Sequence, residues 1–280
     1  MTLISAEALH ERAAHPRLRI ADLRWYLGRP GAGHAAYQGG HLPDAIFLDL
    51  DTDLSAATGP GRHPLPHPAL FAARLGALGI GNDDLVVAYD DAGGGVASRL
   101  WWMLDDLGHR DVAVLDGGIE AWTAAGFPLT TEVPTFPPAR LELAPEWSKV
   151  IDREALVPRL GSIVLLDGRA GPRYRGETEP VDPVAGHIPT AISAPIADDL
   201  GPDGRFLSPT ELAERFWGLG ATGRQVVTSC GSGTNACQLA LAMRIAGLPD
   251  PLLYPGSYSD WSRAGMPVAT GPEPGDLPLS

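Results

Sequence analysis

The sequence contains few cysteines and few basic residues. Of its 280 residues only two are cysteine, and 21 lysines and arginines face 34 acidic residues, which gives a net charge of −13. Two cysteines are too few for a disulfide framework, and the spacing of cysteine and histidine does not match a zinc site. We therefore expect neither a metal nor another cofactor. The shortage of clustered positive charge argues against nucleic acid or an anionic membrane as a partner.

Long apolar runs are also missing. No run approaches the roughly 20 residues that a membrane-spanning helix needs. The first 15 residues lack a basic segment followed by an apolar one, so we expect no signal peptide. These features predict a cytoplasmic protein whose thiols stay reduced. The length suffices for one large domain or two of ordinary size.

Several short motifs occur twice, in the same order and about 140 residues apart. The pairs are GHLPDA at 40–45 with GHIPTA at 186–191, LVVAY at 85–89 with QVVTS at 225–229, Asp22 and Arg24 with Asp167 and Arg169, and LDGGIEAW ending at Trp122 with YPGSYSDW ending at Trp261. We infer two homologous halves. The expected divisions are an N-terminal non-catalytic domain over 1–129, a proline-rich linker over 130–147, a C-terminal catalytic domain over 148–270 and a tail over 271–280.

Each half alternates short apolar runs with helical patterns. Apolar runs of this kind are typical of strands buried on both faces. The predicted strands lie near 18–21, 45–49, 85–89 and 112–115, and near 163–166, 191–194, 225–229 and 252–254. The clearest predicted helices are PALFAARLGAL, SRLWWMLDDLG and NACQLALAMRIAG. This alternation predicts an α/β fold with a parallel sheet flanked by helices in each half.

One cysteine follows directly on a predicted buried strand. Cys230 opens the loop SCGSGTNAC, which leads into a helix predicted to begin at about Thr234 or Asn235. Ligands bind at the carboxyl ends of strands in such sheets. We expect Gly231 and Gly233 to adopt positive φ and turn successive N–H groups inward as an anion nest. The nest and the helix dipole favour a thiolate without a neighbouring histidine.

The same position in the first half carries a different residue. Asp90, in AYDDAGGGVASR, takes the place of the cysteine. The nucleophile is therefore present in the second half only. Cys237 lies inside the helix that follows the loop, and we interpret it as a small core residue.

Taken together, these motifs resemble the two-domain rhodanese family, the thiosulfate and 3-mercaptopyruvate sulfurtransferases, in its bacterial type. The resemblance runs from about Ile20 to Val268 and rests on both GH[LI]P motifs, SRLWW, the DGG…AW and PGS…DW segments and the cysteine loop. It implies two rhodanese-like domains and a sulfurtransferase. In this family the cysteine takes a sulfane sulfur from a small anionic donor, becomes a persulfide and passes the sulfur to cyanide or a thiol, such as that of a thioredoxin-like protein.

The loop sequence Gly-Ser-Gly-Thr-Asn resembles the mercaptopyruvate branch, and thiosulfate is the second candidate donor. The resemblance implies catalytic roles for Cys230 and Ser232. It also implies that the donor is bound by a set of side chains and loop residues: Arg173, Gly231, Gly233, Thr234, Asn235, Arg62 and His41. Arg173 matches the arginine that holds the donor's anionic end, and Ser232 and His41 match the serine and histidine of a relay proposed for that branch.

Two further segments bear on the donor. Animal mercaptopyruvate enzymes carry a second arginine just after a Glu-Pro pair, whereas here Glu179-Pro180 is followed by Val181 and Asp182. The segment GPGRHPLP at 59–66 resembles one that is common in bacterial members. We expect its Arg62 and His63 to reach toward the cysteine loop and supply positive charge.

Two alternative functions remain open at the level of sequence. A phosphatase of the rhodanese-like fold needs an arginine six positions after the cysteine to hold phosphate, and Ala236 stands there. A non-enzymatic binding or redox-sensing protein is the second alternative, since the first half already lacks the nucleophile. The retained Cys230 favours the enzyme.

Overall fold

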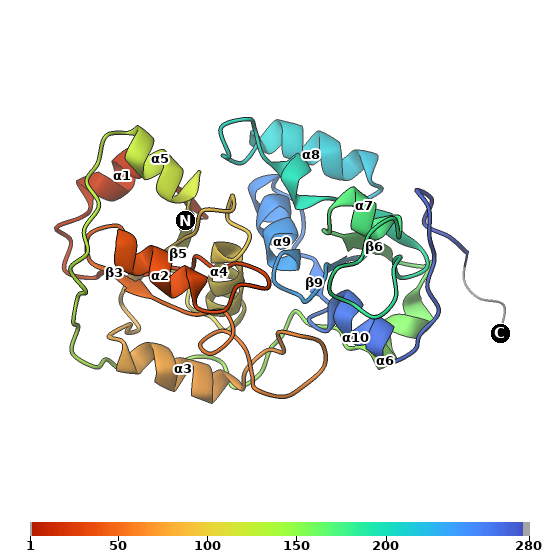
Figure 1. The fold of residues 1–280 in the computed structure, drawn as a ribbon, viewed down its shortest axis with the longest axis horizontal. Helices are drawn as coiled ribbons and strands as arrows, with labels where there is room; N and C mark the ends of the chain where they lie inside the picture. Colours follow the sequence, from red (N-terminus) through yellow and green to blue (C-terminus); the bar gives the residue numbers. More distant parts are fainter. Residues whose placement is uncertain (1, 277–280) are drawn as a thin grey trace. The chain divides into compact units, whose positions relative to one another are not determined.

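The computed structural model describes residues 2–276, so Met1 and the last four residues of the expected tail lie outside the described part. The chain divides into two compact units (Figure 1). The first unit comprises the described residues to Ala56, Pro66–Ser148 and Gly201–Phe206. The second unit comprises Ala57–Leu65, Lys149–Leu200 and the described residues from Leu207.

The first unit is built on a five-stranded parallel sheet with the order β1-β5-β4-β2-β3. Its strands are β1 (Leu3–Ile4), β2 (Leu18–Asp22), β3 (Ala45–Phe47), β4 (Leu85–Tyr89) and β5 (Val112–Leu115). Its helices are α1 (Ala6–Glu11), α2 (Ala32–Gly39), α3 (Pro68–Ala77), α4 (Ala97–Asp106) and α5 (Gly118–Ala124).

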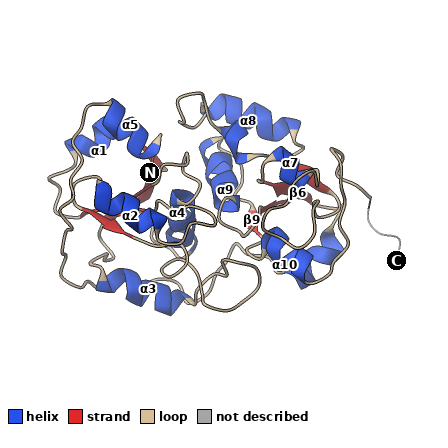
Figure 2. Ribbon diagram, in the orientation of Figure 1, coloured by secondary structure: helices blue, strands red, loops and turns tan. Residues whose placement is uncertain are grey.

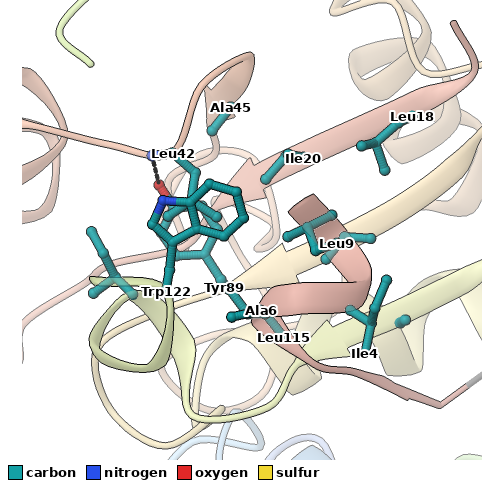
Figure 3. Packing of buried hydrophobic residues seen from close by; sticks show 13 residues of the cluster. Ile4, Ala6, Leu9, Leu18, Ile20, Leu42, Ala45, Tyr89, Leu115 and Trp122 are labelled. Atoms are coloured by element: carbon teal, nitrogen blue, oxygen red, sulfur yellow. Dashed lines mark hydrogen bonds between the residues drawn. The ribbon is translucent and has the colours of Figure 1, made fainter. Parts of the chain in front are cut away.

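Alternate residues of these strands pack against α1 and α5. Figure 3 shows Trp122 of α5 and Leu9 of α1 in one cluster with Ile20 and Tyr89 from the strands. The hydroxyl of Tyr89 accepts the N–H of Leu42 at 3.2 Å, so this buried polar group is paired. The intervening strand residues, such as Val86, are buried as well. Both faces of the sheet are therefore covered, as a parallel sheet requires.

The second unit has a four-stranded parallel sheet with the order β7-β6-β8-β9. Its strands are β6 (Val164–Asp167), β7 (Ala191–Ser193), β8 (Val226–Ser229) and β9 (Leu252–Leu253). Its helices are α6 (Arg153–Leu156), α7 (Gly171–Tyr174), α8 (Pro209–Gly218), α9 (Ala236–Ile245) and α10 (Ser257–Arg263), with the 3₁₀ turns η1 (Val157–Arg159) and η2 (Ile196–Asp199). Strands and helices alternate along each unit, and Figure 2 shows the helices in blue and the strands in red.

Each predicted strand is present within two residues of its expected bounds, and the three predicted helices are α3, α4 and α9. The predicted α/β class with a helix-flanked parallel sheet in each half is confirmed. β1, a two-residue strand at the edge of the first sheet beside β5, was not predicted. Two residues are too few to show a periodicity.

Matching side chains make the same bonds in both units. Arg24 pairs with Asp22, and Arg169 with Asp167, through closest contacts of 2.6 and 2.7 Å. Each arginine also donates a hydrogen bond to a glycine carbonyl of the GH[LI]P motif, at 2.7 Å in both units. These equivalences give the inferred internal repeat a structural basis.

The proline-rich segment between the repeats is extended and held to the first unit. Residues 131–149, all within the described part, form neither helix nor strand. Backbone bonds join Ala139 to Gly76, Arg140 to Asn82 and Ala144 to Leu107, at 2.8–3.2 Å. Among residues 2–276, none of the helices combines the length and the apolar composition that a membrane crossing requires.

Candidate active site

The cysteine loop joins β8 to α9 at the carboxyl end of the second sheet. Cys230 is the first residue after β8, and its side chain is almost fully buried. Its sulfur accepts the backbone N–H of Ser232 at 3.4 Å and that of Gly233 at 3.2 Å. Two N–H groups directed at one sulfur, at the start of a helix, stabilise negative charge there.

The two loop glycines serve different purposes. Gly233 has φ +80°, and a Cβ there would lie 2.4 Å from the carbonyl oxygen of Pro255, so only glycine fits without strain. Gly231 does not have the positive φ that we expected. A Cβ at Gly231 would instead lie 2.8 Å from a guanidinium nitrogen of Arg62. Gly231 therefore leaves room for a cation beside Cys230.

The start of α10 holds this loop in place. The hydroxyl of Ser257 accepts the N–H of Cys230 at 3.1 Å. In return, Tyr258 and Ser259 donate their N–H groups to the carbonyls of Cys230 and Gly231, both at 3.0 Å. Ser257 has φ +51°, an uncommon value for a residue with a side chain. Backbone strain at this position accompanies a rigid support for Cys230.

Two arginines approach the loop from different segments of the second unit. Arg173 lies on α7, just after β6, and Arg62 lies in the Ala57–Leu65 segment. A Cβ on Gly231 would be 3.4 Å from Arg173 Nη1, so both guanidinium groups border the loop. Asp182 forms an ion pair with Arg62 and another, at 3.2 Å, with Arg173. Glu179 pairs with Arg173 at 2.7 Å.

Burial shifts the pKa values in this cluster. Burial raises the pKa of Asp182, although Arg62 and Arg173 oppose the shift. Burial also lowers the pKa of Arg62, and the Asp182 carboxylate counteracts this. For Glu179, burial is outweighed by hydrogen bonds from Arg173 and two backbone N–H groups, which lower its pKa. These charges are therefore held close together with little water around them.

A histidine contacts the loop serine. His63 Nδ1 lies 2.8 Å from the Ser232 hydroxyl and 3.4 Å from that of Thr234, and all three side chains are buried. From the family resemblance we expected His41 to be the relay histidine. His41 instead directs its ring nitrogens at two backbone carbonyls of the first unit, those of Tyr37 at 2.8 Å and Glu132 at 3.1 Å. The histidine that the structure brings to Ser232 is His63.

His41 has an equivalent in the second unit. His187 directs Nδ1 at the Tyr174 carbonyl at 2.8 Å and stacks on the Tyr174 ring with centroids 3.8 Å apart. His41 stacks on Tyr37 at the same 3.8 Å. This shared packing explains why the GH[LI]P motif occurs in both halves. The motif signals structure, whereas His63 itself is not repeated, because the matching segment GPDGRFLSP at 201–209 carries Phe206 in its place.

The end of the loop differs slightly from expectation. α9 begins at Ala236, and Asn235 is its N-cap, but the Asn235 side chain makes no capping hydrogen bond to the residues described. Thr234 is buried and directed toward His63 rather than acting as a cap. Cys237 is buried in α9, and its thiol donates to the Gly233 carbonyl at 3.3 Å.

The equivalent loop in the first unit contains its own anion. The carboxylate of Asp90 accepts four backbone N–H groups at 2.8–2.9 Å, those of Ala92, Gly94, Val96 and Ala97. The first-unit loop thus keeps the inward-facing N–H groups, but a side chain occupies them. A carboxylate in this position is no sulfur nucleophile.

Known proteins share both the domain and the arrangement. The sequence profile of the rhodanese-like domain matches residues 5–125 and 153–264. The chain is 47% identical to a probable 3-mercaptopyruvate sulfurtransferase of Pseudomonas aeruginosa, over 96% of this chain and 98% of that protein. It is 36% identical to the thiosulfate sulfurtransferase of Mus musculus, over 94% of this chain and 91% of the relative.

Solved structures agree with these sequence matches. A crystal structure of a 3-mercaptopyruvate sulfotransferase from Escherichia coli superposes with a TM-score of 0.83 at 29% identity, covering 92% of this chain and all of that one. The chain therefore belongs to the rhodanese family and carries two copies of the rhodanese-like domain. This confirms the resemblance drawn from the sequence motifs.

Proposed function

We propose that this protein is a sulfurtransferase that moves a sulfane sulfur from 3-mercaptopyruvate or thiosulfate to a thiol or cyanide, with Cys230 as the nucleophile. The observation that carries the proposal is the sulfur of Cys230 accepting two loop N–H groups beside two guanidinium groups. A small anionic sulfur donor needs both features, a nucleophile and a local positive site in an acidic protein.

The first half-reaction is a displacement at sulfur. The Cys230 thiolate attacks the outer sulfur of thiosulfate, a new S–S bond forms, and the old S–S bond breaks with its electron pair leaving on sulfite. With mercaptopyruvate the C–S bond breaks instead, and the electron pair leaves on the enolate of pyruvate. The thiol proton of the donor ends on carbon, giving pyruvate. Both donors leave the same cysteine persulfide.

The loop then holds the persulfide anion. The N–H groups of Ser232 and Gly233 hold the charge near the sulfur. For mercaptopyruvate, the Ser232 hydroxyl with His63 at 2.8 Å is placed to carry the proton to the enolate. Arg173 and Arg62 hold the anionic end of the donor. In the second half-reaction a thiol or cyanide attacks the outer sulfur, and Cys230 leaves as thiolate.

Mercaptopyruvate is the favoured donor, because only this donor requires the proton path that the Ser232–His63 pair supports. Cys230 and Cys237 do not form a disulfide, which fits a reducing compartment. We therefore propose a cytoplasmic enzyme with a thioredoxin-like dithiol as an acceptor. Turnover with reduced thioredoxin against cyanide, at matched donor concentration, tests the acceptor.

The test of the function is intact-protein mass spectrometry after incubation with each donor separately. Wild type should gain one sulfur atom, and Cys230→Ser should gain none. Cys237→Ser is the matched control, since its thiol lies in α9 and donates to a carbonyl. It should load as wild type does. Loading at Cys237, or no loading from either donor in wild type, would overturn the proposal in favour of a binding or redox-sensing protein.

A phosphatase is not supported by the loop. The position that would carry its phosphate-binding arginine is Ala236, which is buried at the first turn of α9. The two arginines that border the loop come from α7 and from the Ala57–Leu65 segment instead. They approach Gly231, next to the nucleophile.

A further inference from the structure

The arginines beside the cysteine loop are bridged by one buried carboxylate. The side chain of Asp182 is 0% exposed, and one of its oxygens pairs with Arg62 and the other with Arg173. The two arginine side chains are 14% and 18% exposed. Asp182 thus lies among the groups that would meet the anionic end of a donor.

The charges in this cluster cancel. Arg62 and Arg173 supply two positive charges, and Glu179 and Asp182 supply two negative ones. Arg169 adds a positive charge near Glu179, but it is paired with Asp167 at 2.7 Å. A donor therefore meets directional guanidinium N–H groups whose charge is largely balanced within this cluster, while Arg263 lies within electrostatic reach of Arg62.

The charge of the donor therefore determines how tightly it binds at this site. A donor with one negative charge can be held by hydrogen bonds from the guanidinium groups. A second negative charge loses its hydration on entry and is repelled by the Asp182 carboxylate at close range. At a distance of about 6 Å and an effective dielectric constant of about 20, one such repulsion lowers the binding constant by about tenfold to a hundredfold.

We propose that Asp182 is a specificity-determining residue that selects singly charged sulfur donors over doubly charged ones. The inference rests on the proposed function, because it concerns the donor site of the same sulfur transfer. It assigns mercaptopyruvate, which carries one carboxylate, as a better donor than the thiosulfate dianion. The discrimination comes from charge cancellation and not from the shape of the loop.

The test uses two donors that differ by one charge and react in the same way. Thiosulfate carries two negative charges, and methanethiosulfonate carries one, with a methyl group in place of one oxygen. Each gives its outer sulfur to the thiolate and releases sulfite or methanesulfinate. Persulfide formation is followed by rapid quench and intact mass, and each rate is divided by that donor's rate with a free small thiol. This normalisation removes the donor's own reactivity.

In wild type the normalised rate should be higher for methanethiosulfonate. Asp182→Asn should raise thiosulfate loading by about tenfold or more and change methanethiosulfonate loading much less. Asp182→Ser should act in the same direction, and Asp182→Glu, which keeps the charge, should retain the wild-type preference. The wild-type comparison needs no variant, so the proposal stays testable where a variant does not fold.

Asp250 provides the matched control. It also bridges two cations, Lys149 at 2.7 Å and Arg244 at 2.6 Å, but it precedes β9 and so lies at the amino edge of the sheet, opposite Cys230. Asp250→Asn changes the net charge equally and should leave the donor ratio unchanged. An unchanged ratio in Asp182→Asn, or an equal shift in Asp250→Asn, overturns the inference while sulfur loading itself continues. Failure of wild type to load from either donor instead overturns the proposed function, and the inference with it.

Discussion

Replacing Gly233 with alanine is expected to damage both stability and sulfur loading. The residue has φ +80°, and a Cβ there would lie 2.4 Å from the Pro255 carbonyl oxygen and 3.0 Å from its carbonyl carbon. The obstructing atoms belong to the backbone, so they cannot rotate away as a side chain would. The loop or the Pro255 segment has to move.

Two costs set the size of the destabilisation, one from the backbone conformation and one from the contact with Pro255. An alanine in the left-handed region costs about 1–2 kcal/mol, and forcing an extra methyl into a packed site costs about 1–3 kcal/mol. We expect Gly233→Ala to lower the free energy of unfolding by about 3 kcal/mol. Gly265→Ala separates the backbone cost from the cost of the contact, because Gly265 has φ +67° and no atom within 4 Å of its Cβ position. The free energy of unfolding of Gly265→Ala should therefore fall by only about 1–2 kcal/mol, which is what a left-handed alanine costs.

The assays are urea unfolding and persulfide loading by intact mass. Any shift of the loop moves the Gly233 N–H away from the sulfur of Cys230, now 3.2 Å distant. Loss of one such donor lowers a rate by about a hundredfold or more where it stabilises the reacting charge, so we expect Gly233→Ala to load sulfur at least about tenfold more slowly. Gly265→Ala should load at the wild-type rate. Equal stability of the two variants would refute the contact with Pro255, and wild-type loading by a folded Gly233→Ala protein would refute the role of the loop N–H.

The other predictions concern proton transfer and buried charge. Ser232→Ala should slow sulfur loading from mercaptopyruvate by about a hundredfold, as loss of a proton donor does. It should slow loading from thiosulfate only slightly, since sulfite leaves without protonation. Equal slowing with both donors would contradict the proton path. Burial raises the pKa of Asp199 to about 7, although Arg215 opposes the shift, so the native state keeps a proton that the unfolded chain releases from about pH 4 upward. Wild-type stability should therefore fall by about 4 kcal/mol between about pH 4 and pH 8 through this group, and Asp199→Asn should lack this part of the fall. Urea unfolding at both pH values measures the free energy of unfolding of the two proteins. The same fall in wild type and in Asp199→Asn would contradict the raised pKa of Asp199.

Much of the fold could be predicted from the sequence, because the governing rules are local. Apolar runs such as LVVAY mark strands buried on both faces, and glycines and prolines mark where they stop. The repeat of Asp22 and Arg24 as Asp167 and Arg169 identified two related halves without any coordinates. Cys230 was identified as the candidate nucleophile on the same basis, since a cysteine between a buried strand and a helix has few structural explanations.

The partners of the nucleophile could not be assigned in this way. Ser232 and His63 are 169 positions apart in the sequence, and Arg62 and Asp182 are 120 apart. A repeated motif drew attention to His41, but repetition indicates shared packing. The histidine that contacts Ser232 is not repeated, because Phe206 stands at the matching position of the second half.

The sequence by itself determined the α/β class, the duplication, the place of Cys230 after a buried strand and its replacement by Asp90 in the first half, because these depend on residue type and short-range order. The tertiary structure alone decided which histidine contacts Ser232, why Gly231 is glycine, and that Asp182 bridges Arg62 and Arg173. Each of these depends on distances between side chains far apart in the chain. Hydrogen bonds and Coulomb interactions depend on the distance between groups, and only the folded chain sets that distance.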